Sequence, residues 1–288
     1  MDSVLRAIDD WLHGKLVDGI MNNLSGMFSA VNDEVASIAS DVATSPVDFA
    51  PGVFALIRNV SESVIVPIAG LILTFIACYE LIQLVVERNN LANFETWIFF
   101  KWVFKTFVAV TLISNTFDIV MAVFDVAQHV ISQAGGIIQG STEVSEAQLM
   151  ALRGSLEAME TTDLIGVWIQ ALIVRITLML LSKVVFVIIY GRMIEIYLTT
   201  SLAPIPFSTF GNKEASHMGH NYFKSLAALG FQGFLIMIVV GIYAVLIQNI
   251  SFGADVTGCI WAVMGYTILL CYTLFRTGSL AKSIFGAH

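Results

Sequence analysis

Apolar residues along the chain occur in long runs that short polar segments separate. A transmembrane helix needs about 20 predominantly apolar residues to cross the hydrocarbon core of a bilayer. Five runs have this character, and we expect them to form the spans of an all-α integral membrane protein. The expected spans are residues 64–86, 97–115, 164–189, 227–247 and 259–274. Pro67 is expected to kink the first span or to lie in its first turns.

The first 45 residues have an amphipathic pattern instead. Two apolar stripes recur at helical spacing on either side of Ser25 and Gly26, which predicts two short helices with one apolar side each. The stripes are Leu5, Ile8, Leu12, Leu16 and Ile20, followed by Phe28, Val31, Val35, Ile38 and Val42. The apolar sides either pack on the protein itself or lie on the membrane or a partner, and the pattern leaves both open.

The second expected span continues into a helical segment, up to residue 134, that has a polar side. Polar residues fall near one face of this segment at spacings of three, four and seven. The main ones are Asn115, Asp118, Asp125 and His129. The segment either projects out of the membrane or faces a wet interior, so these residues are candidates for a polar stripe along a lumen or a subunit interface.

Composition supports a lipid environment. Hydrophobic residues make up 57% of the 288 residues and charged residues only 12%, whereas a soluble domain carries roughly 25% charged residues. The net charge is −8, and no stripe of Lys and Arg is present. Tight direct binding of nucleic acid is therefore not expected, because such binding rests on neutralising phosphates with cations.

Motifs of catalysis do not occur in the sequence. We find no P-loop, no GxGxxG, GxSxG or HExxH motif and no zinc-ligand spacing. His217 and His220 could supply at most half of a metal site. We therefore expect no enzyme, no cofactor and no metal centre.

The distribution of Lys and Arg predicts the orientation of the chain, because these residues collect on cytoplasmic loops. One set of segments carries Arg88, Lys101, Lys105, Arg192, Lys213, Lys224, Arg276 and Lys282, and the opposite side has Arg6, Lys15, Arg58 and Arg153. We expect an outside N-terminus, a cytoplasmic C-terminus, an extracytoplasmic amphipathic region at 1–60 and a transmembrane domain at 61–288. Insertion would be in a bacterial inner membrane.

Several charged residues fall inside the expected spans, where an unpaired charge costs a few kcal/mol. Glu80 is expected to pair with Lys101 or Lys105, either as a clamp between helices or as part of an ion pathway. Arg175 and Lys183 lie within the third span.

Lys183 can extend toward lipid phosphates. Asp118 or Asp125 could neutralise Arg175, either as an ordinary pair within the chain or as part of a lumen or interface. In the fourth span Gly230, Gly233 and Gly241 lie along one side, and small residues there favour close helix packing.

Four stretches resemble the TrbL-like polytopic subunits of conjugation systems, in the form found in integrative conjugative elements of Gram-positive bacteria. They are FALIRNVSESVIVPIAGLILTFIACYELIQLV, WIFFKWVFKTFVAVTLISNTFDIVMAVFD, IYGRMIEIYLTTSLAPIPFSTFGNKE and NYFKSLAALGFQGFLIMIV. The resemblance implies an inner-membrane core subunit of a type IV secretion apparatus that forms a homo-oligomeric ring for DNA or protein transfer. It also implies contacts with membrane lipids, the secretion ATPases and the coupling protein.

Two other functions stay open at this point. A stand-alone transporter or ion channel would be expected to show an inverted repeat around a midplane site, and we see no internal repeat. An immunity or regulatory membrane protein that blocks a channel is the other. If the chain is a secretion subunit, the largest cytoplasmic segment, Ile194 to Lys224, is the expected contact for partners.

Overall fold

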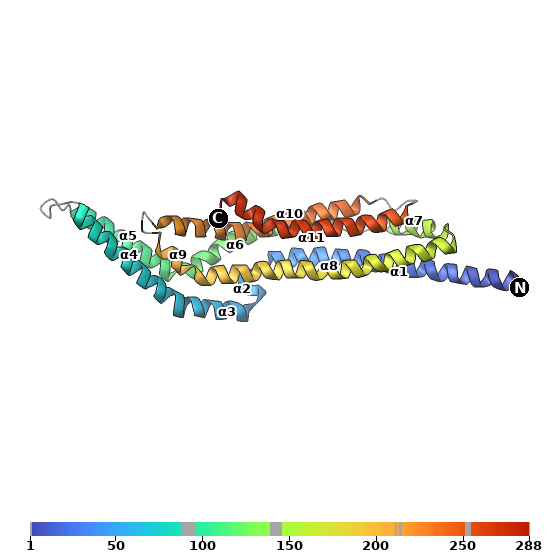
Figure 1. Cartoon of the computed structure of the whole chain (residues 1–288), viewed down its shortest axis with the longest axis horizontal. Helices are drawn as coiled ribbons and strands as arrows, with labels where there is room; N and C mark the ends of the chain where they lie inside the picture. Colours follow the sequence, from blue (N-terminus) through green and yellow to red (C-terminus); the bar gives the residue numbers. More distant parts are fainter. Residues whose placement is uncertain are drawn as a thin grey trace. The chain divides into compact units, whose positions relative to one another are not determined.

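The computed structural model describes residues 2–87, 96–138, 146–210, 212, 215–250 and 255–287. Within these ranges every regular element is a helix, which confirms the all-α class. The elements are α1 (Asp2–Ala43), α2 (Pro46–Phe49), α3 (Pro51–Val60), a π-helical turn (Ser61–Ile65), α4 (Val66–Glu87), α5 (Thr96–Ser114), α6 (Thr116–Ile138), α7 (Glu146–Glu157), α8 (Thr161–Leu202), α9 (Pro204–Ser208), α10 (Ser216–Gln248) and α11 (Val256–Phe285) (Figure 1).

Five helical stretches are long and apolar enough to cross a membrane, and they contain the five expected spans nearly in full. They are Pro51–Val86, Trp97–Ser114, Thr161–Ser208, Ser216–Gln248 and Val256–Phe285. Helix α6 is not among them. The chain turns at Asn115, so the segment beyond the second span is a separate helix and not a straight continuation.

The chain folds into two compact units, each assembled from three separate segments. Unit 1 comprises Met1–Ala43, Ser132–Ile189 and Leu235–Thr277, and unit 2 comprises Thr44–Ile131, Tyr190–Phe234 and Gly278–His288. The boundary expected at residue 60 separates an extracytoplasmic region from the transmembrane domain. The packing of the helices does not test this boundary, which stays a prediction.

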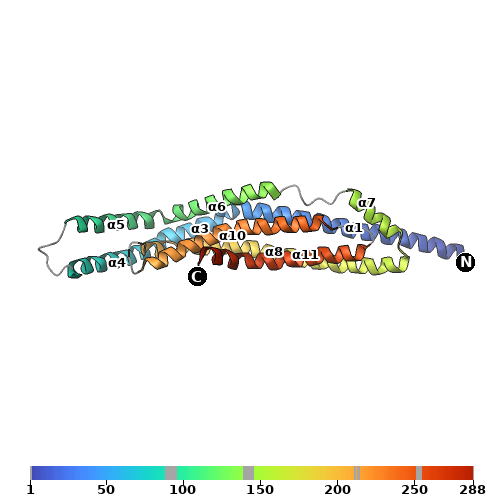
Figure 2. The same ribbon diagram turned by 90° about the horizontal axis from the view of Figure 1, so that it is seen from above.

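Unit 1 is a bundle in which parts of α1, α8, α10 and α11 run side by side (Figure 2). The Trp261 indole N–H of α11 donates to the Gln170 amide oxygen of α8 at 3.0 Å. Tyr243 of α10 and Thr267 of α11 share a hydrogen bond of 2.7 Å between their hydroxyls. Each of these two pairs of helices is therefore joined by a polar contact, exposed between α8 and α11 and buried between α10 and α11.

Helix α1 corrects the expectation of two short N-terminal helices, because it continues unbroken through Ser25 and Gly26. Glycine inside a helix costs about 1 kcal/mol relative to alanine. Burial of one large apolar side chain stabilises the folded chain by about 1.5–3 kcal/mol. The buried apolar stripe runs across the expected break and comprises Val17, Ile20, Leu24, Met27, Phe28, Val31, Val35, Ile38 and Val42. Packing therefore outweighs the local cost.

The apolar residues of α1 are mostly exposed in its first part and mostly buried in the rest. From Val17 onward the stripe packs on the protein itself. The first expected stripe is exposed over most of its length, with Leu5 at 61% and Ile8 at 55% exposure, and Trp11 beside it at 64%. The start of α1 thus presents an apolar face that the described residues leave uncovered.

Unit 2 has its core where α6, α8, α9 and α10 meet. Its buried apolar residues are Val120, Phe124, Met193, Ile196, Tyr197, Ala203, Phe207, Leu226 and Leu229. The Tyr197 hydroxyl donates to the Pro46 carbonyl at 2.7 Å and so fastens α2 to α8. Helix α8 ends at Leu202, two residues before Pro204, and the prolines of α9 have no backbone N–H with which to continue the helical hydrogen bonds.

The π-helical turn explains how Pro67 fits near the start of α4. A proline ring inside a helix clashes with the carbonyl four residues earlier, here that of Ser63. The turn widens the helix at this point, and the Val66 N–H reaches back five residues to the Ser61 carbonyl. Pro67 is thus accommodated in the first turn of α4 by the wider turn before it.

Gly26→Ala tests the continuity of α1. A Cβ at Gly26 meets no atom within 4 Å, so the variant should raise the free energy of unfolding by about 0.5–1 kcal/mol, as measured by thermal unfolding in detergent. Gly230→Ala is the contrasting variant, because its Cβ would lie 3.0 Å from the Cβ of Ala127 and should lower stability. A loss of stability in Gly26→Ala would indicate a break in α1 at this residue.

Candidate functional site

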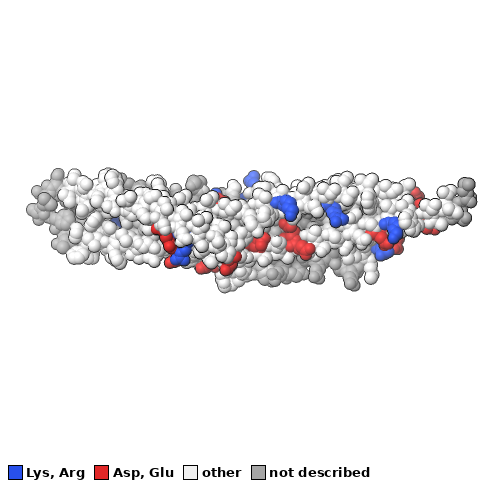
Figure 3. Space-filling view, turned by 90° about the horizontal axis from the view of Figure 1, so that it is seen from below, with Lys and Arg blue, Asp and Glu red and all other residues white. Residues whose placement is uncertain are grey.

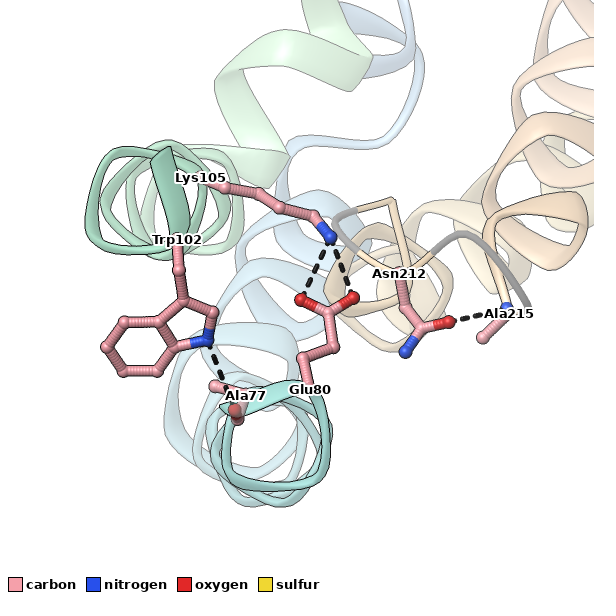
Figure 4. Close-up of polar contacts among 6 residues, drawn as sticks. All are labelled: Ala77, Glu80, Trp102, Lys105, Asn212 and Ala215. Carbon is pink, nitrogen blue, oxygen red and sulfur yellow. Dashed lines mark hydrogen bonds and ion pairs between the residues drawn. The ribbon is translucent and has the colours of Figure 1, made fainter. Parts of the chain in front are cut away.

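The ion pair between Glu80 of α4 and Lys105 of α5 is the most enclosed salt bridge among the described residues. The Lys105 ammonium donates to both carboxylate oxygens of Glu80, at 2.7 and 2.9 Å. The Glu80 side chain is 16% exposed and that of Lys105 39%. Figure 4 shows the pair between the two helices.

A second contact between α4 and α5 lies one helical turn from this pair. Trp102 precedes Lys105 by three residues, and Ala77 precedes Glu80 by three, so each pair lies on one side of its helix. The Trp102 indole N–H donates to the Ala77 carbonyl at 3.2 Å (Figure 4). Lys101 lies elsewhere: its ammonium is 5.5 Å from the centre of the Trp97 ring. The structure therefore brings Glu80 to Lys105 and not to Lys101.

The expected polar stripe lies on the exposed side of α6 and of the turn before it. The Asn115 amide donates to the Thr111 carbonyl at 2.8 Å, and Asp118 lies 3.7 Å from the Arg58 guanidinium. Asp125 and His129 are exposed further along the helix. The opposite side of α6 is buried through Phe117, Val120, Phe124, Ala127 and Ile131. Helix α6 therefore has one polar and one apolar side.

The polar contact of Arg175 lies within unit 1, and the expected pairing with Asp118 or Asp125 of unit 2 stays a prediction. The Arg175 guanidinium donates to the Asn23 amide oxygen of α1 at 2.8 Å, while Asp118 neighbours Arg58 and Asp125 is exposed. The sequence could not reveal this, because the continuous α1 that places Asn23 beside α8 was not expected. Lys183 is exposed. In the part of the chain that the structure describes, neither Arg175 nor Lys183 forms a salt bridge.

Arg192 is a buried cation that the distribution of Lys and Arg assigned to the cytoplasmic segment between the third and fourth spans. It lies inside α8, is 5% exposed, and approaches only one acceptor among the described residues, the Leu229 carbonyl, at 3.5 Å. Its Nε and Nη1 atoms have no hydrogen-bond partner in the same part of the chain. Gly233 leaves room for the guanidinium, since a Cβ there would lie 2.7 Å from Nη2 of Arg192, but a glycine in the sequence does not reveal a cation on another helix.

The three glycines of α10 differ in their surroundings. A Cβ at Gly230 would lie 3.0 Å from Ala127, and one at Gly233 would lie 2.5 Å from Ile131. Both are buried, whereas Gly241 is half-buried. Gly230 and Gly233 thus permit the close approach of α6 to α10.

The remaining candidates carry no cluster that could hold a metal within the described residues. The His220 ring nitrogen Nδ1 lies 2.7 Å from the Ser216 carbonyl, and its ring packs against Phe210. Across the described ranges no three His, Cys, Asp or Glu side chains come together as ligands. Arg88 and Lys213, used above for the orientation, lie outside the described residues.

The face shown in Figure 3 carries few charged side chains, and most of its surface is uncharged. With five apolar helices of spanning length, these features define a multi-pass α-helical membrane protein.

The chain belongs to the family of TrbL/VirB6 plasmid conjugal transfer like proteins, whose family model matches residues 31–204, more than half of its length. This confirms the resemblance noted from the sequence. The protein is a membrane subunit of a conjugative type IV secretion system. Comparison with curated proteins and with solved structures gives no match.

Neutralising one member of the Glu80–Lys105 pair should lower stability. Glu80→Gln leaves the Lys105 ammonium without its counter-ion and should cost about 1–3 kcal/mol in unfolding free energy. The double variant Glu80→Gln with Lys105→Gln should recover most of the loss, because neither charge is then left alone. Thermal unfolding in detergent measures both, with Lys101→Gln as the control. Strictly additive losses would contradict the pairing.

Arg192→Met should leave stability unchanged or raise it by up to about 2 kcal/mol. Apolar side chains of similar volume often replace poorly paired buried charges at no cost. Arg192→Ala is the control and should destabilise by leaving a cavity. A Met variant as unstable as the Ala variant would mean that the guanidinium itself holds α8 and α10 together.

Proposed function

We propose that the chain is the inner-membrane channel scaffold of its conjugation system and assembles as a homo-oligomeric ring for the transfer of DNA or protein. One observation carries the proposal: α6 has an exposed polar side opposite its buried apolar side. In a protein with five apolar spanning helices, such a side requires water or another subunit. Asp118, Asp125 and His129 are the residues that would face the lumen or the neighbouring subunit.

The orientation that suits this role has the N-terminus outside and the C-terminus in the cytoplasm. Residues 1–60 would then lie on the extracytoplasmic side, and the segment from Ile194 to Lys224 would face the secretion ATPases and the coupling protein. This segment includes the two prolines of α9 and an aromatic cluster in which the Phe207 ring contacts those of Phe210 and Tyr222 at 5.2 and 5.9 Å. Phe207 is buried, so this cluster belongs to the core beneath the segment and supports it from inside.

The Glu80–Lys105 pair fits a structural role in this assembly. A neutralised pair between two adjacent helices fixes their relative position and leaves no net charge in the membrane. We assign it as a clamp between α4 and α5 and not as part of an ion pathway.

The mass of the purified protein tests the ring. In a mild detergent the full chain should form a discrete species several times heavier than 31.5 kDa, as measured by light scattering with the detergent contribution subtracted. Asp125→Lys should weaken the assembly and lower conjugative transfer at least about tenfold, because it reverses the charge at a position that would recur at every interface of the ring. Asp10→Lys, an exposed acid on α1, is the matched control.

Two results would contradict the proposal. One is a wild-type protein that is monomeric both in mild detergent and in lipid nanodiscs. The other is an Asp125→Lys variant whose mass and transfer equal those of the Asp10→Lys control. Labelling of single cysteines at positions 10 and 282 from either side of the membrane tests the orientation, with position 10 expected outside.

A further inference from the structure

Unit 1 contains a hollow between α1 and α8 that the family role does not use. The volume of this hollow is about 290 Å³. The α1 side carries Gly26 and Ala30, whose small side chains leave the space open. Two hydrogen bonds between the helices lie along it, from Arg175 to Asn23 at 2.8 Å and from Ser182 to Glu34 at 2.6 Å.

The walls of the hollow are mainly apolar, formed by Met27, Val31, Leu178, Val185 and Leu270. The polar groups at its base are already satisfied, because Tyr243 and Thr267 bond to each other and Thr267 also donates to the Val263 carbonyl. The interior therefore offers an apolar surface and few free hydrogen-bonding groups, which suits a hydrocarbon chain better than a polar solute.

Cations line the α8 edge of the hollow. Arg175, Met179 and Lys183 follow one another at four-residue spacing, so they form a stripe along one side of α8, and all three are exposed. The one acid among the lining residues, Glu34, accepts the Ser182 hydroxyl. Neither cation has a salt bridge among the described residues, although α8 is apolar enough to span a membrane.

We propose that this hollow binds one anionic phospholipid, with its phosphate at Arg175 and Lys183 and an acyl chain against Gly26 and Ala30. The charges are complementary, since a lipid phosphate supplies the anion that the two cations lack. The cations are about 12 Å apart along the helix axis, a distance that their long side chains can close around one headgroup.

Free phosphate and a second copy of the chain are the competing occupants. Inorganic phosphate would use the cations but not the apolar walls. A second copy would bring a carboxylate to the cations. Removal of the cations would then weaken the oligomer. The lipid alone needs both the cations and the open apolar space, and its binding is measured independently of the proposed ring.

Native mass spectrometry of the full-length protein with added dioleoyl phosphatidylglycerol or dioleoyl phosphatidylcholine tests the site. The wild type should bind phosphatidylglycerol more tightly than phosphatidylcholine. Arg175→Gln and Lys183→Gln should each weaken phosphatidylglycerol binding about fivefold, because each removes one cation near the headgroup. Arg276→Gln, an exposed cation of α11 that does not line the hollow, is the control and should change nothing.

Gly26→Leu tests the apolar part separately. No atom lies within 4 Å of a Cβ at Gly26, so the leucine should fill the hollow without distorting α1. Binding of phosphatidylglycerol should fall at least about tenfold, since the acyl chain loses its place. Gly14→Leu is the matched control, because it also has open space on α1 and lies away from the hollow.

Three results would overturn the proposal. The first is equal binding of the two lipids by the wild type. The second is unchanged phosphatidylglycerol binding in Gly26→Leu with loss in the cation variants, which would indicate a phosphate site alone. The third is a change of oligomeric mass in the cation variants with no change in lipid binding, which would indicate a second copy. Equal melting temperatures of each variant and its control ensure that the comparison is made on folded protein.

Discussion

The placement of charge in a chain surrounded by lipid is the constraint on which this structure depends. Water does not reach the hydrocarbon to solvate an ion, so each ionic group in a span needs a partner, a polar neighbour or an exit to the surface. The molecule uses all of these. Glu80 and Lys105 neutralise each other, Arg175 contacts an amide, and Lys183 is exposed. Arg192 is the exception, with one long contact to a carbonyl.

The sequence predicted the spans well because their signal is strong and local. A run of apolar residues has few alternatives to a membrane helix, and prolines mark where α8 stops. The Glu80–Lys105 contact could also be anticipated, because the two helices are joined by a short linker and the charges lie at matching depth. That Glu80 pairs with Lys105 and not with Lys101 could not be anticipated, because the pairing depends on which side of α5 faces α4.

Features that rest on contacts distant in sequence escaped prediction. The continuity of α1 depends on the burial of its apolar stripe. The local sequence at Ser25 and Gly26 shows only the low helix propensity of glycine. The partner of Arg175 lies 152 residues away on that same helix. The burial of Arg192 was not expected, because the third span was ended at residue 189 and the contact with Leu229 of α10 is distant in sequence.

The π-helical turn at Ser61–Ile65 has a consequence for how the chain tolerates change in length. An α-helix advances by about 100° per residue, so one extra residue would rotate everything before it by that angle unless a wide turn absorbs it. Arg58 lies just before this turn and reaches Asp118 and the Phe117 ring. A single-residue deletion between Ser61 and Ile65 would therefore convert the turn to ordinary helix and leave Arg58 facing both. The phase of α3 around its own axis is thus insensitive to this one surplus residue, which evolution can remove or restore in a single step.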